Sequence, residues 1–221
     1  MNKYKKFFKI TIFILFFPSI MEESIAENID ELISNLESRD WRIRLSAVEE
    51  LGRIKDEKSI NLLMNVAGAK SEVWQVKIKA IRLLGEIGDP KAIDLLAKIF
   101  NDPFLNFECP AIKWNTATAL GSFKKSSRVV DMLINALDDD NLIIKEAVIQ
   151  SLGKIGDTRA VPFLIPALHD KSFAIKLSAI KALGEIGDPQ AIPSLKEIAD
   201  KDNDLYIKNE ALSVLKTFAN E

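Results

Sequence analysis

The nine residues 181–189 read KALGEIGDP, and this stretch decides the fold because the chain repeats it. Residues 84–90 read LGEIGDP and residues 152–157 read LGKIGD, while looser copies occupy residues 51–56 and 120–123. The first glycine of each copy serves as a reference: Gly52, Gly85, Gly121, Gly153 and Gly184. Subtracting successive numbers gives steps of 33, 36, 32 and 31 residues. A nearly fixed period of this length is typical of a protein built from stacked repeats.

Conserved spacing of residue types within the copies indicates helices. Counting from the reference glycine, position −9 is β-branched, position −8 is basic and position −1 is leucine in every copy. A further step of 32 from Gly184 reaches Lys216, which gives a degenerate sixth copy. The apolar positions −9, −5, −4, −1 and +2 lie three or four residues apart, which is one stripe of an α-helix. We call this segment helix B of each unit.

The residues after helix B predict where it ends and where the next helix begins. A glycine at +3, as in Gly88, suits the left-handed conformation that commonly ends a helix. The aspartates at +4 suit an N-cap, and two of them precede a proline that fits the first helical position: Asp89, Asp157 and Asp188. A second helix, helix A of the next unit, therefore begins within about a turn. The reference glycine itself costs about 1 kcal/mol relative to alanine inside a helix, so its repetition predicts close approach of two helices.

The unit Leu-Gly-x-Ile-Gly-Asp-x-x-Ala, preceded by Ile-basic-x-x-Ala, resembles the HEAT repeat family. More narrowly, it is similar to the short HEAT-like repeats of phycobilin lyases. The resemblance covers six units, roughly residues 28–219, so that residues 27–221 are expected to form one HEAT-like domain. It implies an all-α, armadillo-like solenoid, an α-α superhelix with A helices on the convex side and B helices on the concave side.

The N-terminal residues 1–26 have the pattern of a secretory signal. Four lysines precede the apolar run Ile10–Phe17, and small residues at Ser24 and Ala26 suit a cleavage site. Eight residues at about 1.5 Å each give about 12 Å of helix, against about 30 Å of hydrocarbon to cross. We therefore expect a cleaved signal and a periplasmic or extracellular protein. The alternative is an uncleaved segment that tethers the protein to the membrane.

Composition argues against several kinds of activity. The chain has 30 basic and 32 acidic residues, and loss of residues 1–26 with four Lys and two Glu leaves 26 and 30, a net charge of −4. Nucleic-acid binding favours a basic surface, so no nucleic-acid partner is expected. One histidine, His169, and one cysteine, Cys109, offer no catalytic or transition-metal set. The acidic run 138–140 could hold Ca²⁺ or Mg²⁺ but is better explained as a solvated turn, so we expect no metal and no cofactor.

The basic residue at −8 has two interpretations. It could form a ladder that contacts an anionic partner, or it could pair with an acidic residue in the turn before helix B of its own or the next unit. The structural pairing is favoured because most turns carry such an acid: Asp40, Asp102, Asp139, Asp170 and Asp202. Exposed pairs of this kind contribute only about 0–1 kcal/mol each.

The tryptophans occupy two different positions. Trp41 and Trp74 stand at −11, where the other units also have apolar residues, and this column predicts packing at the start of helix B. Trp114 stands at −7, a column that tolerates Glu and Asn and is therefore expected to be half exposed. Beside the Phe104–Phe107 loop, Trp114 is a candidate anchor for a partner, since aromatic side chains often dominate interfaces. Packing against that loop is the alternative.

Positions −6, −3 and +1 of helix B form a polar stripe that, by the family geometry, faces the concave side. Its charges are mixed, which suits a protein or peptide better than a polyanion, and solenoids present such surfaces to extended partners. The candidate binding residues are Arg82, Trp114, Thr118, Gln150 and Lys181. The sequence therefore predicts a non-enzymatic scaffold that binds a protein or peptide. The alternative is a lyase-type enzyme subunit or chaperone like the phycobilin lyases.

Overall fold

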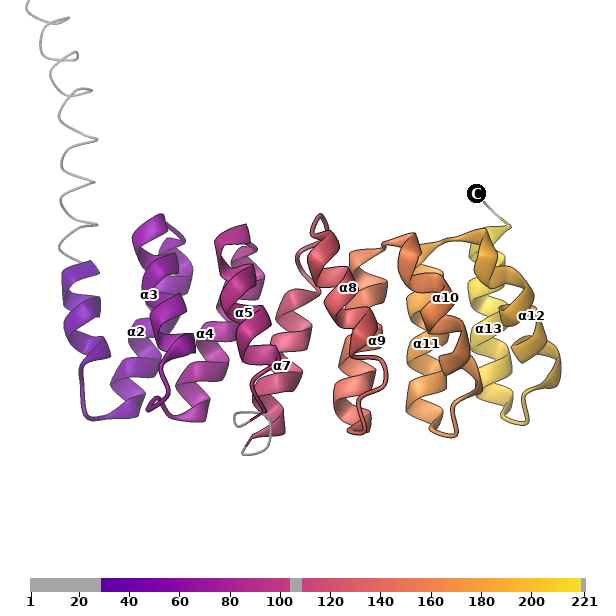
Figure 1. Cartoon of the computed structure of the whole chain (residues 1–221), viewed down its shortest axis with the longest axis horizontal. Helices are drawn as coiled ribbons and strands as arrows, with labels where there is room; N and C mark the ends of the chain where they lie inside the picture. Colours follow the sequence, from indigo (N-terminus) through magenta and orange to yellow (C-terminus); the bar gives the residue numbers. More distant parts are fainter. Residues whose placement is uncertain (1–28, 104–108, 220–221) are drawn as a thin grey trace, which may run out of the picture.

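The repeats form a stack of helical hairpins, as the sequence predicts (Figure 1). The structure is a computed structural model that describes residues 29–103 and 109–219, so the predicted signal in residues 1–26 lies outside it. Every regular element in the described residues is a helix. In Figure 1 the hairpins follow one another in chain order from indigo to yellow. The prediction of an all-α solenoid is confirmed.

Each of the six units contributes one B helix of 11 to 14 residues. The B helices are α2 (Trp41–Ile54), α4 (Trp74–Ile87), α7 (Pro110–Leu120), α9 (Leu142–Ile155), α11 (Phe173–Ile186) and α13 (Leu205–Phe218). The A helices comprise residues 29–36, α3 (Glu57–Gly68), α5 (Ile93–Phe100), α8 (Ser127–Asn135), α10 (Val161–Leu164) and α12 (Ile192–Lys201). Short 3₁₀ turns flank α5, α10 and α12. η1 (Pro90–Ala92) precedes α5, η2 (Thr158–Ala160) and η3 (Ile165–His169) lie on either side of α10, and η4 (Pro189–Ala191) precedes α12.

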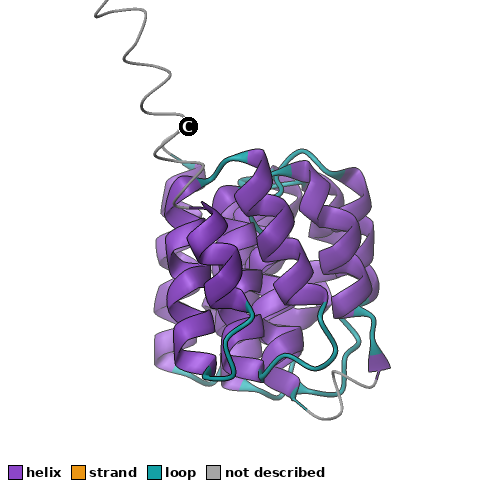
Figure 2. Cartoon of the chain, turned by 90° about the vertical axis from the view of Figure 1, so that its left-hand side faces the viewer, coloured by secondary structure: helices purple, strands orange, loops and turns teal. Residues whose placement is uncertain are grey.

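The helices lie in two layers, which Figure 2 shows with the stack turned by 90°. Helices α3, α5, α8, α10 and α12 each contact the B helix of their own hairpin, and successive B helices contact one another. The core lies between the layers. The leucines at −1 point into it and are at most 1% exposed in units one to five: Leu51, Leu84, Leu120, Leu152 and Leu183. Each hairpin therefore buries its apolar side mainly against its neighbours.

The reference glycines lie where successive B helices approach most closely. A Cβ added to Gly85 would stand 2.6 Å from the Cα of Ala119, and one added to Gly153 would stand 2.7 Å from the Cα of Ala182. Both alanines occupy position −2 of the next unit. The predicted reason for the repeated glycine is confirmed, because a side chain there would displace the neighbouring helix.

The predicted helix ends and caps are also confirmed. Gly88, Gly156 and Gly187 follow helix B with φ of +71°, +76° and +73°, in the left-handed region. The next residue caps the following helix in each case. Asp89 accepts a hydrogen bond from the backbone N–H of Lys91 at 2.8 Å, and Asp188 accepts one from Gln190 at 2.8 Å. The equivalent bond from Arg159 to Asp157 measures 3.0 Å.

Four of the six basic residues at −8 pair with acids, and Lys77 and Lys208 donate to backbone carbonyls, so the structural interpretation is favoured. In four units the acid comes from the turn of the following unit, which ties the hairpins together. The pairs are Arg44–Glu72 at 2.7 Å, Lys113–Asp139 at 2.5 Å, Lys145–Asp170 at 3.0 Å and Lys176–Asp202 at 2.6 Å. Lys77 instead donates to the carbonyl of Ala69 at 2.5 Å, and its burial lowers its pKa.

One packing prediction is wrong. The column at −11 was expected to pack at the start of helix B, but Trp74 is 53% exposed and Leu205 is 72% exposed. Leu142 and Phe173 in the same column are also exposed, and Trp41 is only partly buried against the core. These residues begin their helices, and because helical side chains lean toward the N-terminus, no earlier turn of the same helix lies beneath them. Within the described residues, no helix has the length and apolarity needed to cross a membrane.

Candidate binding groove

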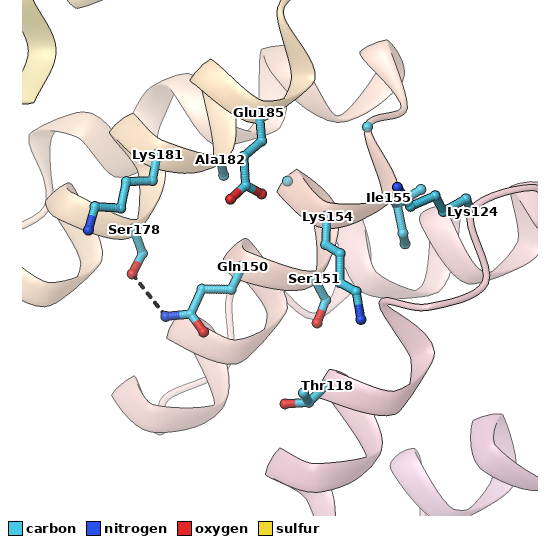
Figure 3. A pocket seen from close by; sticks show the side chains of 12 residues that line it. Thr118, Lys124, Gln150, Ser151, Lys154, Ile155, Ser178, Lys181, Ala182 and Glu185 are labelled. Carbon is cyan, nitrogen blue, oxygen red and sulfur yellow. Dashed lines mark hydrogen bonds between the residues drawn. The ribbon is translucent and has the colours of Figure 1, made fainter. Parts of the chain in front are cut away.

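The B helices of units three to five form an open groove with a volume of about 660 Å³. Thr118, Gln150 and Lys181 all line it, each at position −3 of its own unit. Figure 3 shows that they come from three successive helices, with Lys154 and Glu185 beside them. The structure thus brings together three of the five candidate binding residues. Helical spacing explains this, because equivalent positions of stacked helices face the same side.

Hydrogen bonds between neighbouring units hold the polar lining of the groove. Gln150 Nε2 donates to Glu146 Oε1 at 3.1 Å and to Ser178 Oγ at 3.4 Å, the latter bond being drawn in Figure 3. Ser178 Oγ also donates to Glu146 Oε1, at 3.3 Å. These contacts join α9 to α11 and limit the freedom of the Gln150 side chain, which remains exposed.

The groove carries an excess of positive charge. Its lining contains three lysines and one glutamate, a sum of 3 − 1 = +2, whereas the whole chain has a net charge of −2. Lys154 Nζ donates to the Ser122 hydroxyl at 2.9 Å, a neutral partner. The nearest carboxylate oxygen to Lys181 Nζ belongs to Glu210 and lies 3.9 Å away. Lys124 forms no ion pair with any residue that the structure describes. Lys124 and Lys154 are therefore available to an anionic ligand, whereas Lys181 is shared with Glu210.

The other two candidate residues, Arg82 and Trp114, also lie on B helices but do not line this groove. Arg82 is exposed on α4, one unit before the groove begins. Trp114 is 40% exposed, as its column predicted, and stands one turn before Thr118 on α7. The Thr118 hydroxyl donates to the Trp114 carbonyl at 3.0 Å. The 104–108 segment expected beside Trp114 lies outside the described residues.

The sequence assigned one column to the wrong environment. Position −6 was expected to face the concave side, and Ser46 there is exposed, but in units three to five Asn115, Ala147 and Ser178 are at most 6% exposed because they turn toward the neighbouring B helix. Position −10 was missed, and there Ile143 is 63% exposed and Tyr206 is 55% exposed. A spacing of seven residues from Gln150 would have placed Ile143 on the open face.

Nothing in the described residues resembles a metal centre. Across residues 29–103 and 109–219, no three His, Cys, Asp or Glu side chains lie together in a metal-binding arrangement. In the acidic run 138–140, Asp139 instead accepts hydrogen bonds from Lys113 and from the backbone of Asn141. Asn141, and not an aspartate, caps α9.

Comparison with known families agrees with this architecture. The model for HEAT repeats matches residues 29–105, 104–172 and 130–216. The chain belongs to the HEAT repeat family. No curated protein sequence matches it significantly.

Several solved structures share this HEAT fold. The complex of CpcE and CpcF of phycocyanin lyase from Nostoc sp. is 25% identical, with a TM-score of 0.57 over 85% of this chain and 75% of that chain. A designed armadillo repeat protein in complex with a (KR)4 peptide is 16% identical, with a TM-score of 0.58 over 85% and 98%. The third TOG domain of Drosophila melanogaster Mini spindles is 14% identical, with a TM-score of 0.56 over 87% and 95%. The last two likenesses concern the fold alone.

Proposed function

We propose that this HEAT repeat protein is a non-enzymatic scaffold that holds a protein or peptide partner against its B-helix layer. The observation that carries the proposal is the groove in which Thr118, Gln150 and Lys181 of three successive helices present exposed polar side chains on one side. A ligand lying along the stack would meet all three in order. Repeat proteins use such continuous surfaces to bind extended partners.

Site-specific cross-linking tests this proposal. A photoreactive residue replaces Gln150 in the full chain, and a second variant carries the same residue at Lys98, which is exposed on α5 in the other layer. After irradiation in cells, position 150 should give a discrete adduct with one protein that position 98 does not give. Equal labelling from both positions, or none from position 150, would contradict the scaffold.

A second candidate is a subunit or chaperone of a lyase-type enzyme. It is supported by the 25% identity to the phycocyanin lyase complex over 85% of this chain. That candidate requires the groove to hold a linear tetrapyrrole. Mixing the purified protein with phycocyanobilin and recording the visible spectrum distinguishes the two functions. A shifted, saturable absorption band would favour the lyase relative, and an unaltered pigment spectrum would remove it.

The partner is proposed to lie outside the cytoplasm, because residues 1–26 have the pattern of a secretory signal. Mass spectrometry of the protein purified from its own cells provides the test. We expect a mature N-terminus at or near Glu27. An intact Met1 on protein found in the membrane fraction would instead support the tethered alternative.

A further inference from the structure

Each B helix of units three to six carries an exposed apolar side chain one to two turns before its position −3, and these four side chains form an apolar row. They are Trp114, Ile143, Phe173 and Tyr206, between 40% and 63% exposed. The rings of Phe173 and Tyr206 stand 5.9 Å apart, so the row is continuous between the last two units. Tyr206 precedes Glu210 by one turn, and Glu210 faces Lys181 across units five and six. Large apolar side chains in a contiguous exposed row commonly mark an interaction surface.

The opposite edge of the same surface is cationic. Lys154 lies near the C-terminal end of α9, Lys124 lies in the turn after α7 and Lys181 lies in the middle of α11, with Glu185 as the one acidic residue in the groove lining. Figure 3 shows the Lys154 and Lys181 side chains extending from successive helices beside Gln150. On α9 the exposed face thus runs from the apolar Ile143 past Gln150 to the basic Lys154, while on α11 a lysine, Lys181, stands at the position equivalent to Gln150.

Distances along α9 indicate what kind of ligand can contact both the apolar row and the lysines. Ile143 precedes Gln150 by seven residues and Lys154 by eleven, which corresponds to about 10 and about 16 Å along α9 at 1.5 Å per residue. An α-helix with its side chains is about 10–12 Å wide, so a helix that lies over Gln150 is within side-chain reach of both Ile143 and Lys154.

The charges and dimensions of this surface point to one class of occupant, and we propose that the groove binds an acidic amphipathic α-helix of the partner lying across the B helices of units three to six. Its apolar face packs on Trp114, Ile143, Phe173 and Tyr206, while its carboxylates lie against Lys154 and Lys181. Helices packed 8–10 Å apart give four units a span of about 24–30 Å, which about 18 helical residues match. This inference rests on the proposed scaffold function and adds the chemistry of the partner.

Fluorescence anisotropy with designed peptides tests it on the full chain. The first labelled peptide has about 18 residues with Glu on one face and Leu on the other; a second replaces every Glu with Lys, and a third carries two prolines that prevent a helix. We expect the acidic helix to bind at least about tenfold more tightly than either control, a difference that corresponds to about 1.4 kcal/mol. High salt should weaken the acidic peptide, because its carboxylates meet exposed ammonium groups.

Variants locate the binding site. The double variant K154E/K181E should reverse the preference in favour of the Lys-Leu peptide, while K98E/K196E, which changes the same charges on exposed residues of α5 and α12, should leave it unchanged. Trp114→Ala should weaken the acidic helix without changing the preference for Glu over Lys. Circular dichroism of each variant establishes that the stack remains folded.

The possible outcomes separate this inference from the proposed function. Preference for the basic peptide, or equal binding of the proline peptide, overturns the acidic helix while leaving a scaffold of other specificity. Acidic-peptide binding that is insensitive to K154E/K181E also overturns it, because the contact then lies elsewhere. A cross-link at position 150 to a partner without an acidic amphipathic segment overturns this inference but not the scaffold function. If position 150 gives no cross-link at all, both the inference and the scaffold function are contradicted.

Discussion

At the scale of single residues, the glycines have two different roles. Gly153 allows close helix packing, whereas Gly156 adopts a φ of +76° and has no atom within 4 Å of an added Cβ. The first role is steric and depends on the next unit. The second is conformational and would exist in an isolated hairpin, because a left-handed residue disfavours any Cβ.

Gly153→Val should destabilise the stack. The added Cβ would stand 2.8 Å from the Ala182 Cβ and 2.9 Å from Glu185 Oε2, so α11 must shift. Overpacking of this kind typically costs about 1–3 kcal/mol. Urea unfolding followed by circular dichroism measures the loss. Lys154→Val, at the next and exposed position of the same helix, is the control for introducing valine, and equal midpoints for the two variants would contradict the steric explanation.

At the scale of the element, helix starts and inter-unit ion pairs fix the hairpins. Asp188 follows α11 by two residues and caps the N-terminus of η4. The Lys176–Asp202 ion pair links α11 to the turn before α13. Both depend on short polar side chains at element ends, where backbone N–H groups lack helical partners.

Asp188→Ala should destabilise the protein by about 1 kcal/mol, within the usual range of about 0.5–2 for loss of an N-cap. The reason is that the Gln190 N–H loses its acceptor at 2.8 Å. Thermal unfolding provides the measurement. Asp188→Asn keeps an acceptor oxygen at the same place and should retain most of the stability. A loss as large for Asn as for Ala would show that the charge, and not the cap, is responsible.

The ion pairs make stability depend on pH in the acid range. The hydrogen bond from Lys176 holds the pKa of Asp202 below its ordinary value, and the Ser172 backbone N–H does the same for Asp170. Their contribution is therefore complete above the pKa of an unfolded Asp, about 3.9, and is lost as the pH falls through the lower folded values.

The corresponding test is urea unfolding between pH 7 and pH 2. Asp202→Asn should be less stable than the parent at pH 7, and this difference should shrink as the pH falls below about 4. Asp138→Asn, at an exposed position in the turn before α9, should follow the parent at every pH. A difference that grows on acidification would be inconsistent with a carboxylate stabilised in its charged form.

At the scale of the whole molecule, contacts follow chain order, so each hairpin depends on its immediate neighbours. Successive B helices contact one another from α2 to α13, and the core runs along the stack without a central hub. In such an array, stability is approximately a sum over units and the interfaces between them.

Deletion of residues 188–221, the sixth hairpin, should lower the unfolding temperature but leave the first five units folded. The loss comes from one interface, in which α13 contacts α11 and α12 contacts η3. Mean residue ellipticity at 222 nm should stay close to the parent value at low temperature. Loss of the helical signal throughout would contradict the neighbour-only arrangement.

The sequence by itself determined the repeat, the alternation of helices, the left-handed glycines and the aspartate caps. These features depend on interactions within a few residues, so spacing alone reveals them: Gly187 and Asp188 end one helix and begin another. The close approach at Gly153 was also predictable, because its cost recurs in every unit.

Only the tertiary structure decided which positions of helix B remain open. A helical stripe fixes the relative angles of residues but not the direction of the neighbouring helix, which covers Asn115 and Ser178 and leaves Ile143 exposed. The same applies to the basic residue at −8, which in four units pairs with an acid in the turn of the following unit, as Lys176 does with Asp202. Contacts between units depend on how the hairpins stack, and that geometry is a property of the folded chain.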